Sequence, residues 1–227
     1  MTPSCECAYQ KLQERLAAHW QTASNKKPNL LAMDKLLSAF LREMQEQDMD
    51  MIPVSASYLF RTAGVDNAVF FHNFRTLDGL ILVTKGVIVK EIDHHINGPL
   101  GVFSYKTALT RLFDYLASTG TSPQDSPANR LRFATLRFSS DFWEIALYPL
   151  YPYITKPLSG YSRTAKELFY SQYAAAFRSI LKLWLEQNLA PEYKTQYIDL
   201  LLEMMDMTIL KLEMVESHLK GLSVSSE

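Results

Sequence analysis

Glycine is scarce in this chain: eight of the 227 residues are glycine, and none lies between Gly160 and Gly221. A fold with many strands needs tight turns, which glycine usually supplies, so this scarcity argues against a many-stranded sheet. Apolar residues recur instead at spacings of three and four, which is the period of helices that bury one face. The sequence therefore predicts an all-α protein.

Cysteine is also rare, since the two that occur, Cys5 and Cys7, lie too close together to cross-link a fold. No apolar run approaches the roughly 20 residues of a membrane-spanning helix, and the first residues lack the pattern of a secretory signal. Neither sign of charge dominates, because the formal net charge is −1. We therefore expect a cytoplasmic protein with no membrane partner, in which any attraction to nucleic acid is local.

Helical spacing and turn residues divide the chain into a series of predicted helices. They span about residues 6–22, 29–47, 55–62, 66–73, 76–95, 101–117, 128–148, 162–188 and 191–220. Ser55 stands where an N-cap belongs, and Asn97-Gly98-Pro99 combines two signals that end a helix. The aromatic stretch that follows Tyr148, interrupted by prolines, is predicted to be a loop folded back over a core or a pocket.

A helix, a short helix, a glycine turn and a second short helix follow one another between residues 29 and 74. This order is that of a DNA-binding helix-turn-helix, in which the second short helix enters the major groove. Gly64 suits the tight turn because glycine tolerates the backbone angle that the turn demands. The spacing alone is weak support, since short helices joined at a glycine occur in many bundles.

The residues themselves add to the spacing. From residue 54 to residue 80 the chain reads VSASYLFRTAGVDNAVFFHNFRTLDGL, which resembles the DNA-binding signature of the TetR/AcrR family of transcription regulators over about Leu30–Leu82. The positions that match the signature are Leu59, Ala63-Gly64-Val65, Phe70-Phe71-His72, Phe74 and Leu80. Phe71 and Leu77 stand where the family usually has a tyrosine and a lysine.

The resemblance implies three regions with different roles along the chain. It implies an N-terminal helical extension at 1–27, a three-helix DNA-binding domain at 28–75, and a ligand-sensing and dimerisation domain at 76–227 with a linking helix at 76–97. The implied function is that of a repressor, which binds a palindromic double-stranded DNA operator as a homodimer and is released by a small, mostly apolar or aromatic effector. Effector binding would shift the linking helix and so change the separation of the two recognition helices.

The residues predicted to approach DNA lie on the second short helix and beside it. Asparagine pairs with adenine edges, a small apolar side chain meets a thymine methyl group, and serines and basic residues anchor phosphates. The predicted DNA-binding set is Lys26, Lys27, Ser55, Ser57, Asp66, Asn67, Ala68, Val69, Phe71, His72, Asn73 and Arg75.

Local charge leaves a second interpretation open. Residues 26–97 hold eight basic and nine acidic side chains, whereas a module that grips phosphates usually carries a positive face. The alternative is a degenerate helix-turn-helix, in a protein that acts as a ligand sensor or a protein-interaction module without specific DNA binding.

An aromatic middle segment and two long amphipathic helices make up the C-terminal half. The predicted effector pocket is Phe103, Phe113, Phe138, Phe142, Trp143, Tyr148, Tyr151 and Phe177, with filling of the core as the alternative for each. The predicted dimer interface is Phe169, Tyr173, Ile180, Trp184, Tyr197, Leu201, Met204, Thr208 and Leu212, in a four-helix bundle across a twofold axis. The alternative is that these stripes close the core of the monomer.

No motif of an enzyme or of a metal site stands out. The sequence has no phosphate-cradling glycine loop, no serine elbow and no zinc-binding helix motif. Asp93-His94-His95 lacks a third ligand at a suitable spacing, and Cys5-Glu6-Cys7 is better explained by two idle thiols. We therefore expect neither catalysis nor a metal or cofactor.

Overall fold

The computed structural model describes residues 5–22, 35–36, 38–40, 55–98, 104–118, 127–128, 131 and 142–224, apart from the side chains at 5, 22, 212 and 215–224. Within these ranges the chain is helical and contains no strand, as the scarcity of glycine predicted. None of the helices described is both long and apolar enough to cross a bilayer.

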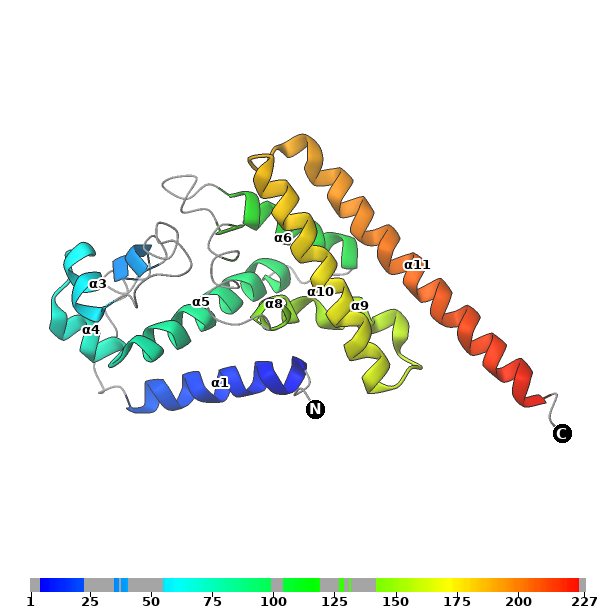
Figure 1. Ribbon diagram of the computed structural model, residues 1–227, viewed down its shortest axis with the longest axis horizontal. Helices are drawn as coiled ribbons and strands as arrows, with labels where there is room; N and C mark the ends of the chain where they lie inside the picture. Colours follow the sequence, from blue (N-terminus) through cyan, green and yellow to red (C-terminus); the bar gives the residue numbers. More distant parts are fainter. Residues whose placement is uncertain are drawn as a thin grey trace.

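The helices follow the predicted order closely (Figure 1). They are α1 (Cys5–Thr22), α3 (Ala56–Thr62), α4 (Asn67–Asn73), α5 (Leu77–Asn97), α6 (Tyr105–Ala117), α8 (Phe142–Ala146), η2 (Tyr148–Leu150), α9 (Tyr151–Thr155), η3 (Lys156–Leu158), α10 (Arg163–Glu186) and α11 (Pro191–Val224). Residues 35–36 and 38–40 are also helical and belong to the predicted helix at 29–47, whose other residues lie outside the described ones.

Side-chain caps fix where several helices begin. A cap oxygen accepts a hydrogen bond from one of the first backbone N–H groups, which have no partner inside the helix. Ser55 accepts the N–H of Tyr58, Asp66 that of Ala68, Thr76 that of Gly79, Ser104 that of Thr107, and Ser162 that of Ala165. The boundaries of α3, α4 and α5 are therefore encoded in the local sequence.

The segment from Phe142 to Leu158 differs from its prediction. The sequence predicts one helix through Tyr148 and then a loop, whereas the structure has the short helices α8, η2, α9 and η3 in succession. A proline stands in the first turn of η2, of α9 and of η3, where its missing N–H costs nothing but where it cannot continue the helix before it. The segment does fold over the core, because Ile154 and Leu158 are fully buried.

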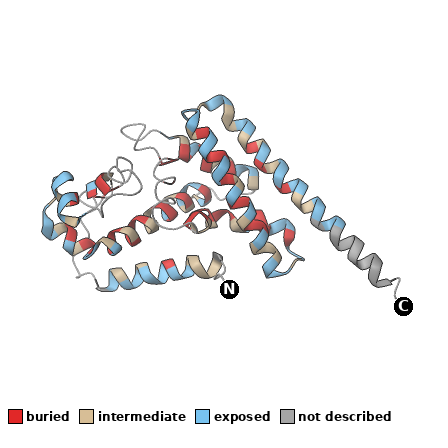
Figure 2. Ribbon diagram, in the orientation of Figure 1, coloured by how far each residue is buried: buried red, intermediate tan, exposed pale blue. Residues whose placement is uncertain are grey.

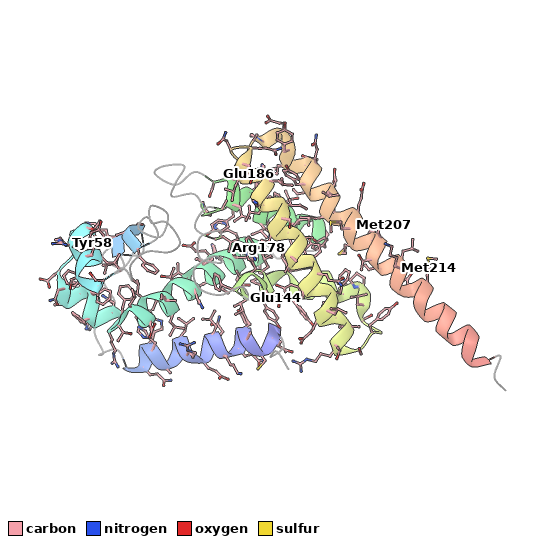
Figure 3. All side chains as sticks on the ribbon, in the orientation of Figure 1. Tyr58, Glu144, Arg178, Glu186, Met207 and Met214 are labelled. Atoms are coloured by element: carbon pink, nitrogen blue, oxygen red, sulfur yellow. The ribbon has the colours of Figure 1, made fainter. Side chains whose placement is uncertain are left out.

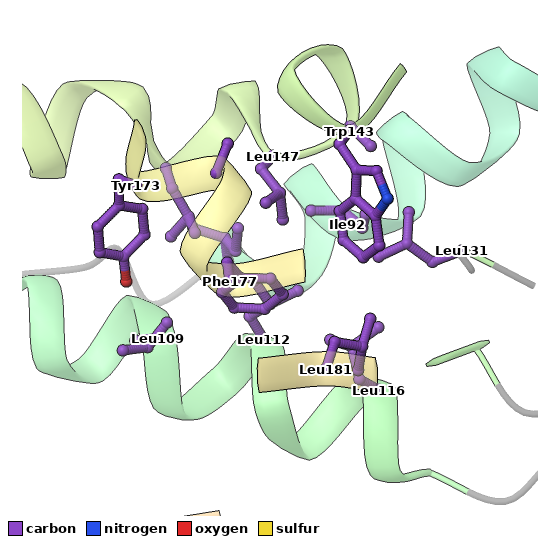
Figure 4. Close-up of a cluster of buried hydrophobic side chains, with 14 of the residues drawn as sticks. Ile92, Leu109, Leu112, Leu116, Leu131, Trp143, Leu147, Tyr173, Phe177 and Leu181 are labelled. Atoms are coloured by element: carbon purple, nitrogen blue, oxygen red, sulfur yellow. The ribbon is translucent and has the colours of Figure 1, made fainter. Parts of the chain in front are cut away.

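Two clusters of buried side chains hold the chain together. The larger lies among α5, α6, α8 and α10, and includes Ile92, Leu112 and Phe177 (Figure 4). The smaller lies among residues 36–40, α3, α4 and the first half of α5, and includes Leu59 and Phe70. Helix α5 contributes buried side chains to both clusters, so it connects them, and Figure 2 shows buried positions along its length.

Helix α1 lies alongside α5 (Figure 1), and close contacts occur at two glycines of α5. A Cβ atom added at Gly86 would lie 2.5 Å from Cδ1 of Leu16, at the end of a flexible side chain. A Cβ atom added at Gly79 would lie 1.9 Å from the carbonyl oxygen of Phe74 and 3.1 Å from the ring of His19. The absence of a side chain at Gly79 therefore lets the end of α4, the start of α5 and α1 meet at one point.

We expect Gly79→Ala to lower the free energy of unfolding by at least about 2 kcal/mol, measured by urea unfolding. The new methyl group overlaps a backbone atom, which no rotamer change relieves, and this outweighs the roughly 1 kcal/mol that alanine gains in a helix. Gly160→Ala is the control, because nothing lies within 4 Å of its added Cβ. Equal stability of the two variants would contradict the packing at Gly79.

Candidate nucleic-acid interface

Helices α3 and α4 are joined by a tight turn at Gly64, as predicted. Gly64 has a φ of +62°, a left-handed angle that glycine adopts without steric cost. The N–H of Val65 donates to the carbonyl of Phe60 at 2.9 Å, and the N–H of Gly64 donates to the carbonyl of Arg61 at 3.2 Å. This pair of bonds is the Schellman arrangement that ends a helix, and it sets the direction in which α4 leaves the turn.

The inner side of this unit is packed with apolar side chains. Leu59, Phe70, Phe74 and Leu80 are all fully buried, and the ring centroids of Phe70 and Phe74 lie 5.7 Å apart. All four are among the positions that match the TetR/AcrR signature. The buried rings fix which side of α4 faces outward, and α4 is thereby held on the surface.

The outer side of α4 presents a small mixed surface. Asn67 and Ala68 are exposed, Phe71 is 50% exposed, and Val69 and His72 are half-buried. Beside this surface, Ser55, Ser57 and Arg75 are also exposed. Of the predicted DNA-binding set, only Lys26 and Lys27 lie outside the described residues. The structure thus brings several of the predicted contacts onto one surface around the turn.

Two predicted contacts need correction or a new role. Asn73 is only 2% exposed, and its side-chain Nδ2 donates to the carbonyl of Val69 at 2.7 Å, so it does not face outward. The reason is helical phase, because residue 73 lies three positions after the buried Phe70 and shares its face. Asp66 is exposed, but its carboxylate accepts the N–H of Ala68 at 2.7 Å and serves as the N-cap of α4.

Helix α3 offers two surface residues that the sequence analysis missed. Tyr58 is 39% exposed, and Figure 3 places it at the end of the molecule formed by α3 and α4. The guanidinium carbon of Arg61 lies 6.0 Å from the centre of the Tyr58 ring, a cation–π arrangement that presents a positive charge. The signal in the sequence was the i, i+3 spacing of these two residues, which puts both on one face of the helix.

Helix α1 ties this unit to the rest of the chain. At one end, Nε2 of His19 donates to the backbone carbonyl of Asn73, the last residue of α4, at 2.7 Å. Towards the other end, the Tyr9 ring stacks on Tyr148 with centroids 4.5 Å apart, and Glu6 pairs with Arg163 at 2.9 Å. Helix α1 therefore contacts both α4 and the larger cluster.

Ionisable groups at the contact between α1 and α5 are partly buried. Burial lowers the pKa of Lys85 on α5, and the nearby positive charge of Arg15 on α1 lowers it further. Burial also raises the pKa of Tyr9, with Asp93 as the second cause. The same contact includes apolar packing, because the Leu16 side chain of α1 lies against Gly86 of α5.

Four of the residues predicted to line an effector pocket belong to the core of the chain. Phe113, Phe142, Trp143 and Phe177 are buried core side chains, and the Phe113 and Phe177 ring centroids lie 5.5 Å apart. A place in the core was the alternative interpretation for each of these residues, and these four side chains are buried there. Tyr148 and Tyr151 are half-buried and stack on each other. Phe103 and Phe138 lie outside the described residues.

Most of the predicted dimer interface is also part of the chain's own core. The residues buried there are Phe169, Tyr173, Ile180, Trp184 and Leu201. Tyr197 and Thr208 are half-buried, Met204 is 39% exposed, and the Leu212 side chain is outside the description. The reason is that α11 has apolar residues on two sides. Its outer side exposes Leu200, Met204, Met207, Leu210 and Met214, of which Figure 3 labels Met207 and Met214.

Comparison with models of protein families, with curated proteins and with solved structures found no match for this chain. The residues that the structure describes include no cluster of three or more His, Cys, Asp or Glu side chains placed to hold a metal ion.

We expect His19→Phe to loosen α4 selectively. Phenylalanine keeps the ring but cannot donate to the carbonyl of Asn73, and one such hydrogen bond is worth about 1 kcal/mol. The backbone amides of α4 should exchange with deuterium roughly fivefold faster, with α10 unchanged. Lys11→Ala, at an exposed position of α1, is the control and should leave α4 unchanged. Equal protection of α4 in both variants would show that the His19 contact does not support it.

Proposed function

We propose that this chain is a TetR-like, cytoplasmic transcription regulator, which binds operator DNA as a homodimer through α3 and α4 and responds to a small molecule. The observation that carries the proposal is the outer side of α4. A short helix is held on the surface by buried rings behind it, and it presents Asn67, Ala68 and Phe71 to solvent. The major groove of DNA accepts a helix of this kind.

The exposed side chains divide into two kinds of contact. Asn67 lies at the first turn of α4, where its amide is suited to pair with an adenine edge, and Ala68 beside it is suited to meet a thymine methyl group. Ser57, Tyr58 and Arg61 on α3 are suited to phosphate contacts, which position a protein without reading sequence. The proposal thus assigns base reading to α4 and phosphate anchoring to α3.

Arg75 supports this proposal through its backbone. It is exposed and has a φ of +62°, a left-handed angle that costs a residue with a side chain roughly 1–2 kcal/mol. Glycine would relieve that strain but would remove the charge. An arginine held in this conformation beside α4 is what a phosphate anchor at this surface requires.

The proposed dimer forms through the outer side of α11. Leu200, Met204, Met207, Leu210 and Met214 recur at spacings of three and four, which makes a continuous apolar stripe on a helix. Leu168 and Leu183 on the neighbouring α10 are also exposed, at 62% and 50%. Large apolar side chains gathered on one face are typical of contacts between subunits, and twofold pairing would supply two recognition helices.

A second candidate function rests on Phe71. Its ring is 50% exposed at the centre of the outer side of α4, and aromatic side chains are enriched in protein interfaces. In that case α4 binds another protein and the chain has no specific affinity for DNA. The DNA-binding experiment below decides between the two functions.

We expect Asn67→Ala to weaken operator binding by about 1–3 kcal/mol, or roughly tenfold or more in Kd, because a bidentate contact to one base is lost. The measurement is an electrophoretic mobility shift with the DNA that flanks the protein's own gene, at low salt. Arg75→Gly should weaken specific and non-specific DNA alike and should lower the salt dependence of binding, because it removes a phosphate contact.

The matched control is Gln172→Ala, another exposed amide on α10, which should leave the shift unchanged. The regulator proposal fails if the wild-type chain gives no sequence-specific shift at low salt. Capture of a protein partner that is lost on Phe71→Ser would then favour the second function.

We expect Met207→Glu to convert a dimer to a monomer, measured by analytical ultracentrifugation. The new carboxylate falls in the middle of the apolar stripe, where pairing would bury it without a partner. Thr195→Glu, at an exposed position near the start of α11, adds the same charge on another side of the helix and should leave the dimer intact. A wild-type chain that sediments as a monomer at all concentrations would contradict the proposed interface.

A further inference from the structure

A cavity of about 370 Å³ lies where the start of α6, the segment from α9 to η3 and the helix α11 meet. Its walls come from Tyr105, Pro152, Tyr153 and Pro157, and Met205 lies at its base. Met205 is only 8% exposed, whereas both prolines are exposed, so the base is apolar and the rim is open to solvent. Of the residues predicted to form an effector pocket, none of those that the structure describes lines it.

We propose that this cavity binds a small aromatic or apolar molecule that carries one negative charge. Pockets for small molecules begin at about 300 Å³ and are mostly apolar with few polar groups, and this cavity fits that description. Aromatic rings, proline rings and a thioether are suited to a flat apolar body. Lys156 is the only charged residue among the described residues of the lining, so it would select the anionic group.

The other polar groups of the lining already have partners within the protein. The hydroxyl of Tyr105 donates to the hydroxyl of Tyr173, and the hydroxyl of Tyr153 donates to Oδ1 of Asn97. Ser104 accepts the N–H of Thr107 as the N-cap of α6. These bonds hold the tyrosine rings in place and leave Lys156 as the group that orients a ligand. Burial raises the pKa of Tyr173 well above its usual value, so that hydroxyl adds no negative charge here.

The position of the cavity gives it a regulatory role, and this part of the inference rests on the proposed function. Tyr153, in its wall, bonds to Asn97, the last residue of α5. The opposite end of α5 packs against the α4 helix through Gly79 and Leu80. Met205 belongs to α11, whose outer side is the proposed dimer contact. A ligand in the cavity would therefore contact α11 directly and would be linked to α5 through the hydroxyl of Tyr153.

Two fluorescent probes with the same aromatic body test the site. 8-Anilinonaphthalene-1-sulfonate carries a negative charge, and N-phenyl-1-naphthylamine is its neutral counterpart. Titration of the full chain should show saturable binding of one molecule of the anionic probe per chain. Lys156→Met should raise the Kd of the anionic probe about fivefold, as expected for loss of an ion pair at an open rim. The Kd of the neutral probe should change by less than about twofold.

Two further variants locate the binding. Lys182→Met removes an exposed lysine of α10 and should leave the Kd of both probes unchanged. Pro152→Trp places an indole over the cavity and should abolish binding of both, with thermal unfolding measured to show that the variant folds. The site is overturned if neither probe binds saturably, if both probes still bind the folded Pro152→Trp variant, or if Lys182→Met weakens the anionic probe as much as Lys156→Met does.

Tyr153→Phe tests the link to α5 separately. The ring stays, so affinity for the anionic probe should stay within about twofold, but the hydroxyl bond to Asn97 is lost. At saturating concentration, the anionic probe should change the operator Kd of the wild type at least about threefold. In Tyr153→Phe, the free-energy change that corresponds to this shift in Kd should be less than half as large. An equal response of the two proteins overturns the link. Absence of any operator binding refutes the proposed function, while the two probes still decide the site.

Discussion

The close approach at Gly79 is the constraint on which the rest of the structure depends. The end of α4, the start of α5 and the His19 ring of α1 meet there because Gly79 carries no side chain. That contact sets how the small cluster around Phe70 sits on α5, and α5 then carries the same alignment into the larger cluster through Ile92. The two cores are thus not independent, and the surface of α4 is positioned by packing that lies behind it.

What the sequence could predict was local. The cap at Ser55, the left-handed turn at Gly64 and the end of α5 at Gly98 each follow from a residue whose conformational preference decides the matter nearby. Asn73 shows the limit, since a one-residue step along a helix turns a side chain by about 100°, which is enough to move it from an exposed face to a buried one. For α11 the limit was different. Apolar residues occupy two of its sides, and only the position of α10 and α6 shows that Leu201 faces inward and Met204 outward.

The site differs from its prediction for a related reason. Aromatic residues in the middle helices predict apolar space, but the sequence alone cannot tell whether side chains or a ligand fill it. Phe113 and Phe177 pack against each other in the core, and a cavity opens where prolines break the chain into α9 and η3. Proline prevents those short helices from merging into one rod, and the resulting bend leaves room beside α11. Recognising this required the three-dimensional path of the chain.

Helix α1 has a mechanical consequence. Helices α1 and α5 lie side by side, and each contacts both the α4 end of the molecule and the larger cluster. A single connecting helix would let the unit of α3 and α4 rotate about the helix axis. Two helices side by side resist that rotation but still permit a small slide of one along the other. Motion transmitted to α4 would accordingly be a shear motion, in which the unit of α3 and α4 translates while it keeps its orientation.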